Sequence, residues 1–250
     1  MSDTRIRRIK NLSLCGLLLV SACSRPPAEP EPPVDRLVAL DDAFAAALAP
    51  HDLRTVGAAL IEDGAVVWTG YYGEQSPGVP ASSTTQFNVA SITKTVATEV
   101  VLRLVEQGVL SLDEPMATEW VDPDIADDPR HKLLTPRMVL THTTGLPNWR
   151  FMAADRKLAF EADPGARFTY SGEGFEYLAT FVEKRTGRPF PELVEALVFE
   201  PLGIRNAGYS IDESNFPNIA QAFDDDGEFA GFYCYPETNY CRKTGSSTPA

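Results

Sequence analysis

The sequence predicts an α/β (α+β) fold in which an antiparallel sheet lobe lies beside an all-helical lobe. Two short apolar runs of β-like composition, residues 55–61 and 65–72, are joined by an Asp-Gly pair, which is a strong hairpin signal. A long helical pattern follows from Ser91 to about Gln107, and residues 110–208 carry only helix and loop signals. A sheet-forming segment followed by a long helical stretch favours two packed lobes.

Residues 1–22 have the features of an export signal. A basic start is followed by a short apolar stretch and then by the small residues Ser21 and Ala22. The apolar stretch, from about Leu12 to Val20, is far shorter than the roughly 20 residues that a membrane-spanning helix needs. A permanent membrane helix is therefore the weaker alternative.

The signal ends in Val20-Ser21-Ala22-Cys23, which resembles the bacterial lipobox. We expect Cys23 to be the lipidated first residue of the mature protein; ordinary cleavage beside an incidental cysteine is the alternative. The Pro-rich residues 23–33 favour an extended linker between the lipid and a domain that covers residues 34–250. The protein is thus expected to be exported as a cell-envelope lipoprotein that faces the periplasm. Ser24 is not the aspartate linked to inner-membrane retention in some bacteria, so the outer membrane is favoured.

Composition excludes several classes of partner. The formal net charge of −13 does not suit nucleic acid binding, because a polyanion is repelled by an acidic surface. The chain has three histidines and no Cys/His pair at ligand spacing, so we expect no metal and no cofactor. Cys234 and Cys241 can close a small disulfide in an oxidising periplasm, or remain as two free thiols.

The helices are predicted from apolar spacing and from residues that begin or end helices. Residues 34–48 have apolar side chains at helical spacing and end before Pro50. The helix from Ser91 ends at Gly108, and its expected buried face carries Ile92, Val96, Val100 and Leu104. Further helices are expected at 135–140, with a proline just inside the start, at 174–186 before Gly187, and at about 191–197.

Ser91 and Lys94 are the candidate nucleophile and base. A serine hydroxyl needs an adjacent base near neutral pH, and residues three apart on a helix share one face. The helix N-terminus favours negative charge near the serine oxygen. We expect Val89, Ile92 and Val96 to desolvate the lysine amine. On its own the Ser-x-x-Lys pattern is weak, because an N-cap serine with a surface lysine gives the same spacing.

Five stretches in order make the pattern specific: FNVASITK (87–94), LVEQGVLSLDEP (104–115), LTHTTGLP (140–147), FTYSGEGF (168–175) and EPLGI (200–204). Together they resemble the β-lactamase-related serine hydrolase family, which includes class C β-lactamases, D-alanyl-D-alanine carboxypeptidases and related esterases. The resemblance covers about residues 34–209. It implies a β-lactamase/transpeptidase-like fold and a serine hydrolase that forms an acyl-enzyme on an ester, amide, β-lactam or wall-peptide carbonyl.

The same resemblance places Tyr170 at the tyrosine of the family's Tyr-x-Asn motif, which transfers protons. A phenol has an ordinary pKa near 10, and a neighbouring lysine cation lowers that pKa. Gly172 stands where the family has its substrate-clamping asparagine. This departure lowers the expectation of β-lactam turnover and favours an esterase or peptidase-like activity.

The family's third motif, Lys-Thr-Gly or His-x-Gly on a strand, is not identified. Lys243-Thr244-Gly245 lies only 73 residues after Tyr170, and five residues follow it, too few for the neighbouring strands that a central strand requires. We therefore expect the chain to lack the C-terminal strands of the sheet lobe. A catalytically inactive lipoprotein that binds wall peptide or a protein partner is the alternative function. His142 is expected to make backbone hydrogen bonds, and Trp149 and Tyr209 to be packing residues.

Overall fold

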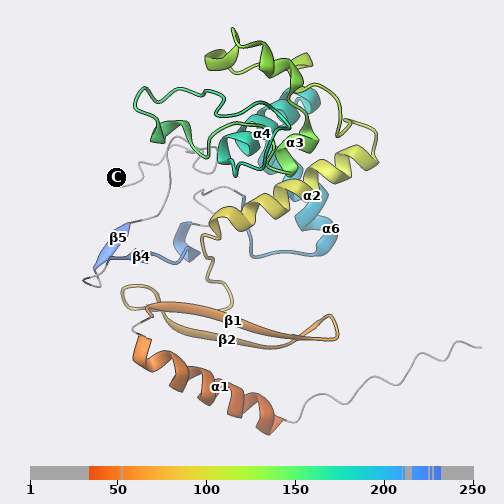
Figure 1. The fold of residues 1–250 in the computed structure, drawn as a ribbon. Coiled ribbons are helices and arrows are strands. Elements are labelled where there is room, and N and C mark those ends of the chain that lie inside the picture. The colour runs from red at the N-terminus through yellow and green to blue at the C-terminus, as the bar shows by residue number, and fades with distance from the viewer. Residues whose placement is uncertain are drawn as a thin grey trace, which may run out of the picture.

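The computed structural model of the protein describes residues 34–51, 53–209, 211, 216–224, 226 and 228–231. A helix covers one side of a β-hairpin, and a lobe built of helices lies on the other side of the hairpin (Figure 1). The expected export signal, Cys23, the Pro-rich linker, Cys234, Cys241 and Lys243-Thr244-Gly245 lie outside the described residues. Within the described ranges, no helix is both long and apolar enough to cross a membrane.

The sheet lobe is built from α1 (Val34–Leu48) and three antiparallel strands, β1 (Thr55–Glu62), β2 (Ala65–Ser76) and β3 (Val79–Pro80). The strands are ordered β1-β2-β3, with a register shift between Leu60 and Ile61. Asp63 and Gly64 both have positive φ, 49° and 79°, as a two-residue hairpin turn requires. The predicted hairpin is therefore confirmed.

The apolar face of α1 covers the hairpin. Phe44 of α1 stacks on Tyr72 with ring centroids 5.8 Å apart and also contacts Trp68 at 5.5 Å. The Tyr72 hydroxyl donates a hydrogen bond to Asp41 Oδ1 at 2.6 Å. Phe44 and Asp41 lie one turn apart on the helix, so one short stretch of α1 fixes it on β2.

The helical lobe contains every regular element between residues 110 and 208, as predicted. Its α-helices are α2 (Thr93–Glu106), α3 (Pro136–Leu140), α4 (Gly172–Thr186), α5 (Phe190–Val194) and α6 (Glu200–Leu202), and η7 (Glu195–Phe199) is a π-helix. The 3-10 turns are η2 (Ala90–Ile92), η3 (Met116–Thr118), η4 (Pro123–Ile125), η5 (Pro129–Leu133) and η6 (Arg150–Met152). The short strands β4 (Ala222–Phe223) and β5 (Phe229–Gly231) pair with each other after η8 (Phe216–Asn218).

Helix ends follow the expected residues. The Thr135 hydroxyl accepts a hydrogen bond from the Met138 backbone N–H at 3.3 Å and so caps α3. Ser171 caps α4 by accepting from Gly174 N at 2.8 Å, and Gly187 ends that helix with φ of 67°. The α4 helix begins two residues earlier than predicted, because its cap is Ser171.

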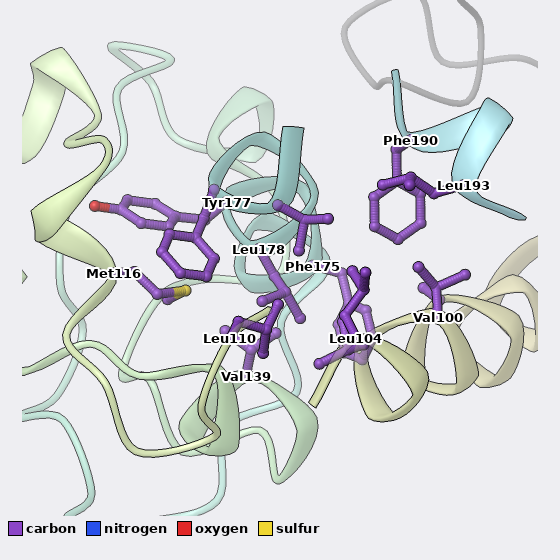
Figure 2. Packing of buried hydrophobic residues seen from close by; sticks show 14 of the residues in the cluster. Val100, Leu104, Leu110, Met116, Val139, Phe175, Tyr177, Leu178, Phe190 and Leu193 are labelled. Atoms are coloured by element: carbon purple, nitrogen blue, oxygen red, sulfur yellow. The ribbon is translucent and has the colours of Figure 1, made fainter. Parts of the chain in front are cut away.

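The hydrophobic core lies where α2, α4 and α5 meet (Figure 2). It contains the fully buried side chains Val100 of α2, Leu178 of α4 and Leu193 of α5. The expected buried face of the first of these helices is correct for Val100 and Leu104 and wrong for Ile92, which is 64% exposed. Ile92 belongs to the 3-10 turn before α2, so it does not follow the register of the helix.

Candidate active site

Ser91 lies in the 3-10 turn that leads into α2, with its side chain exposed. The preceding residue, Ala90, has φ of 45°, a left-handed conformation that is costly for a residue with a Cβ. The Asn88 side-chain Oδ1 accepts from Ala90 N at 2.9 Å and holds this turn. Lys94 follows three residues later, in the first turn of α2, and its Nζ donates to the Ser91 Oγ at 3.1 Å.

Tyr170 reaches the same oxygen from a segment 79 residues later in the chain. Its hydroxyl donates to Ser91 Oγ at 2.7 Å. Burial acts to raise the pKa of Tyr170, but its hydrogen bonds to Ser91 and Lys94 and the charge of Lys94 outweigh burial and lower it. The structure therefore brings together the three predicted site residues around one oxygen atom.

Aromatic rings surround the amine of Lys94. Its Nζ lies 5.1 Å from the ring centroid of Tyr170, 5.6 Å from Phe175 and 5.9 Å from Trp149, within the range of cation–π attraction. The side chain is 7% exposed. The predicted desolvation by Val89 and Ile92 is wrong, since these residues are 48% and 64% exposed. The turn at residues 90–92 directs them to solvent, whereas Val96 packs against the core.

His142 lies against Tyr170. It makes the predicted backbone hydrogen bonds: its carbonyl accepts from Thr169 N at 2.7 Å, and its Nδ1 accepts from Ser171 N at 3.1 Å. The ring centroids of His142 and Tyr170 are 4.5 Å apart. Trp149 and Tyr209, both expected to be packing residues, differ in role. Tyr209 packs on Phe190 with ring centroids 5.5 Å apart, whereas Trp149 borders Lys94.

Residues 40–232 match the family described as Beta-lactamase, which is most of the chain. The chain belongs to the Beta-lactamase family. The resemblance to β-lactamase-related serine hydrolases, drawn above from five short stretches, is thereby confirmed.

Proteins similar in sequence to this chain include hydrolases. Esterase EstB of Burkholderia gladioli is 34% identical over 202 residues, which are 68% of this chain and 50% of the esterase. D-alanyl-D-alanine-carboxypeptidase/endopeptidase AmpH of Escherichia coli K12 is 26% identical over 163 residues, 56% of this chain and 41% of that protein. The chain thus spans about half the length or less of these relatives.

Solved structures of the family share the fold. A class C beta-lactamase superposes with a TM-score of 0.65 at 20% identity, over 79% of this chain and 58% of the other. EstCE1, described as a hydrolase with promiscuous acyltransferase activity, gives a TM-score of 0.63 at 25% identity, over 78% of this chain and 59% of the other. The predicted β-lactamase/transpeptidase-like fold is confirmed.

The departure at Gly172 has a structural counterpart in Trp149. A Cβ at position 172 would lie 2.4 Å from the Trp149 ring, closer than any real contact of this kind. The indole therefore fills the space that a side chain at position 172 would need. Sequence reasoning assigned Trp149 to packing. The unusual glycine is a signal in the sequence that could have indicated a large neighbour at this point.

Substituting Gly172 with alanine is expected to lower the free energy of unfolding by about 1–3 kcal/mol, because the indole has to move. In the Trp149→Ala background the same substitution should cost much less, which urea denaturation of the four proteins would measure. Gly174→Ala on the same helix is the control, since its Cβ would meet no atom nearer than 3.3 Å. Equal losses in both backgrounds would contradict the contact.

An ion-pair cluster centred on Arg150 supports this side of the site. The guanidinium contacts Asp122 at 2.7 Å, Asp124 at 3.1 Å and Glu173 at 2.8 Å, and the Arg150 backbone N–H also donates to Glu173 at 2.8 Å. Although burial opposes it, bonding to Glu173 and Asp122 holds the pKa of Arg150 above its usual value. The cluster joins the Trp149 loop to the first turn of α4, next to Tyr170.

A cavity of about 470 Å³ lies beside the same loop and does not include Ser91, Lys94 or Tyr170. It is lined by Trp120, Asp122, Trp149, Arg150, Phe151, Arg156, Glu173, Glu176, Tyr177 and Thr180. Trp149 thus borders both this cavity and the amine of Lys94. In the part of the chain that the structure describes, no group of three or more His, Cys, Asp or Glu residues is arranged to hold a metal ion.

Proposed function

We propose that the protein is an ester-cleaving serine hydrolase that works through an acyl-enzyme at Ser91. The observation that carries this proposal is the double hydrogen bonding of Ser91 Oγ, which accepts from Lys94 Nζ at 3.1 Å and from Tyr170 OH at 2.7 Å. A protein that only bound wall peptide would need no buried lysine held against an exposed serine hydroxyl. The arrangement therefore favours catalysis over the inactive alternative.

The proposed reaction has two steps. Ser91 Oγ attacks the ester carbonyl carbon while its proton passes to the Lys94–Tyr170 pair, and the pair returns a proton to the departing alcohol. Water then attacks the acyl-enzyme, gives a proton to the same pair, and releases the acid as Ser91 recovers its hydrogen. The N-terminal end of α2 favours the negative charge that develops near Ser91.

Two observations support an ester as the substrate. Esterase EstB is the relative with 34% identity, and Gly172 offers no amide to hold an acylamide side chain. Similarity to AmpH supports wall peptide as the second substrate class. From residues 1–33 alone we also propose export and attachment to the outer membrane through a lipid on Cys23, which would place this chemistry in the periplasm.

A fluorophosphonate probe tests the nucleophile, because it labels only activated serines. Wild type should be labelled, Ser91→Ala should not, and Ser83→Ala, at another exposed serine, should behave as wild type. Equal labelling of Ser91→Ala would contradict the proposal. Rates on a p-nitrophenyl ester, a D-alanyl-D-alanine peptide and a chromogenic cephalosporin then rank the substrates, with the ester expected to be fastest.

A further inference from the structure

We propose that His142 is a positioning residue, which holds the Tyr170 phenol on Ser91 through an uncharged imidazole ring. The proposal rests on the function proposed above, because it concerns the same hydroxyl pair. His142 packs on Tyr170, whereas the side chains that donate to Ser91 Oγ are those of Lys94 and Tyr170. Its effect on the reaction is therefore exerted through the tyrosine.

His142 ties down the chain on both sides of Tyr170. The Thr169 N–H donates to the His142 carbonyl at 2.7 Å, and the Ser171 N–H donates to the His142 Nδ1 at 3.1 Å. The residues before and after Tyr170 thus both donate backbone hydrogen bonds to His142. A shift of His142 would move both attachments together.

The imidazole also packs on the phenol ring. The two ring centroids are 4.5 Å apart with an interplanar angle of 33°. Phe175 and Phe168 lie on the histidine ring at 5.5 and 5.6 Å, so the imidazole is itself held in place. These contacts leave the Tyr170 hydroxyl, which is on a side chain 40% exposed, directed at Ser91 Oγ.

The backbone of His142 is strained, and hydrogen bonds hold it there. Its φ is 54°, in the left-handed region that few residues other than glycine adopt. The His142 N–H donates to the Val139 carbonyl at 3.0 Å at the end of α3, while its own carbonyl accepts from Thr169. Such strain persists only where the surrounding structure fixes it, and here it directs the imidazole at the Tyr170 segment.

The hydrogen-bond pattern fixes the charge state that works. Because Nδ1 accepts a hydrogen bond, the ring proton of neutral His142 is on Nε2. A second proton, on Nδ1, would place two N–H donors against each other, and the Ser171 N–H would lose its acceptor. Among the described residues, the titratable groups that face the ring are Tyr170 and, from α2, Lys94; α4 presents the apolar ring of Phe175.

Burial, and then the charge of Lys94, lower the pKa of His142. The folded protein therefore binds this proton more weakly than the unfolded chain, whose histidine titrates near 6.5. Stability contributed by the neutral ring is present above that pH and is lost as the pH falls below it. The same protonation is expected to release Tyr170 and slow acylation of Ser91.

Two substitutions separate the features of His142, each followed as the fluorophosphonate labelling rate between pH 4.5 and 8. His142→Asn keeps an acceptor for Ser171, tolerates positive φ and does not titrate. In this variant the labelling rate should no longer show the decrease at low pH that protonation of His142 causes. His142→Phe keeps a ring but offers no acceptor, and should be about 10-fold slower at pH 7.5. His51→Asn, at an exposed histidine, is the control and should keep the wild-type profile.

The outcomes are distinguishable from failure of the proposed function. No labelling of wild type would refute the function, whereas labelling of His142→Asn and His142→Phe with wild-type rates and pH profiles would overturn the role of His142. A second measurement needs no activity: imidazole ¹⁵N shifts of the full chain should show the Nε2–H tautomer at pH 7, with the Ser171 amide moving as the ring titrates below 6.5. An Nδ1–H tautomer would overturn the proposal even if His142→Phe fails to fold.

Discussion

Substituting Lys94 with methionine is expected to lower the rate of Ser91 acylation by about 10³-fold, while the protein remains folded. Methionine has a similar length and no amine, so Ser91 Oγ loses the donor at 3.1 Å and Tyr170 loses the cation that lowers its pKa. The aromatic rings that surround Nζ can pack on a thioether, and stability should therefore change little.

The measurement is the second-order rate of fluorophosphonate labelling, read together with the urea midpoint of the same sample. Lys184→Met is the matched control, because Lys184 is an exposed lysine of α4 outside the site, and its rate should equal that of wild type. A rate for Lys94→Met within threefold of wild type would refute the assignment of Lys94 to proton transfer.

Substituting Arg150 with methionine should lower the free energy of unfolding by about 3–5 kcal/mol, since two buried carboxylates would lose their partner. Asp122 and Glu173 are only 4% and 5% exposed, and the guanidinium contacts both at 2.7 and 2.8 Å. Denaturation by urea measures the loss. Labelling of Ser91 should also slow, because Glu173 belongs to the turn of α4 that follows Tyr170.

The control for Arg150→Met is an Arg–Asp ion pair that is exposed to solvent. Arg137 contacts Asp113 at 2.7 Å, but both side chains are more than half exposed. Arg137→Met should cost much less than Arg150→Met, because solvent screens an exposed ion pair. If Asp122→Asn and Glu173→Gln are added to Arg150→Met, part of the loss should be recovered, because neither buried carboxylate is then left as an unpaired charge. Similar costs for Arg150→Met and Arg137→Met would contradict the role of burial.

Local features were predictable from the sequence. The helix at residues 34–48 has its predicted bounds, because apolar spacing and Pro50 are local signals. The hairpin turn followed from Asp63-Gly64, and the end of α4 followed from Gly187. The contact of Ser91 with Lys94 needed only their spacing of three residues, and the place of Tyr170 needed the family resemblance.

Long-range features were not predictable. Lys94 was expected to be desolvated by neighbours in sequence, whereas Trp149, Tyr170 and Phe175 surround it from segments more than 50 residues away. A pattern of apolar residues does not indicate that the chain turns before a helix, and so Ile92 was misplaced. The closeness of Trp149 to Gly172 depends on how the loop at Arg150 docks on α4, where Arg150 pairs with Glu173.

Helix α2 connects the two parts of the molecule that matter most, the site and the core. Lys94 lies in its first turn, while Val100 and Leu104, further along the same helix, lie in the core beside α4 (Figure 2). Tyr170 lies two residues before α4, so the three polar groups meet only when these helices are packed. The fraction of molecules labelled at Ser91 should then equal the fraction in which this lobe is folded. Chemical modification of Ser91 can therefore serve as a folding assay for the lobe.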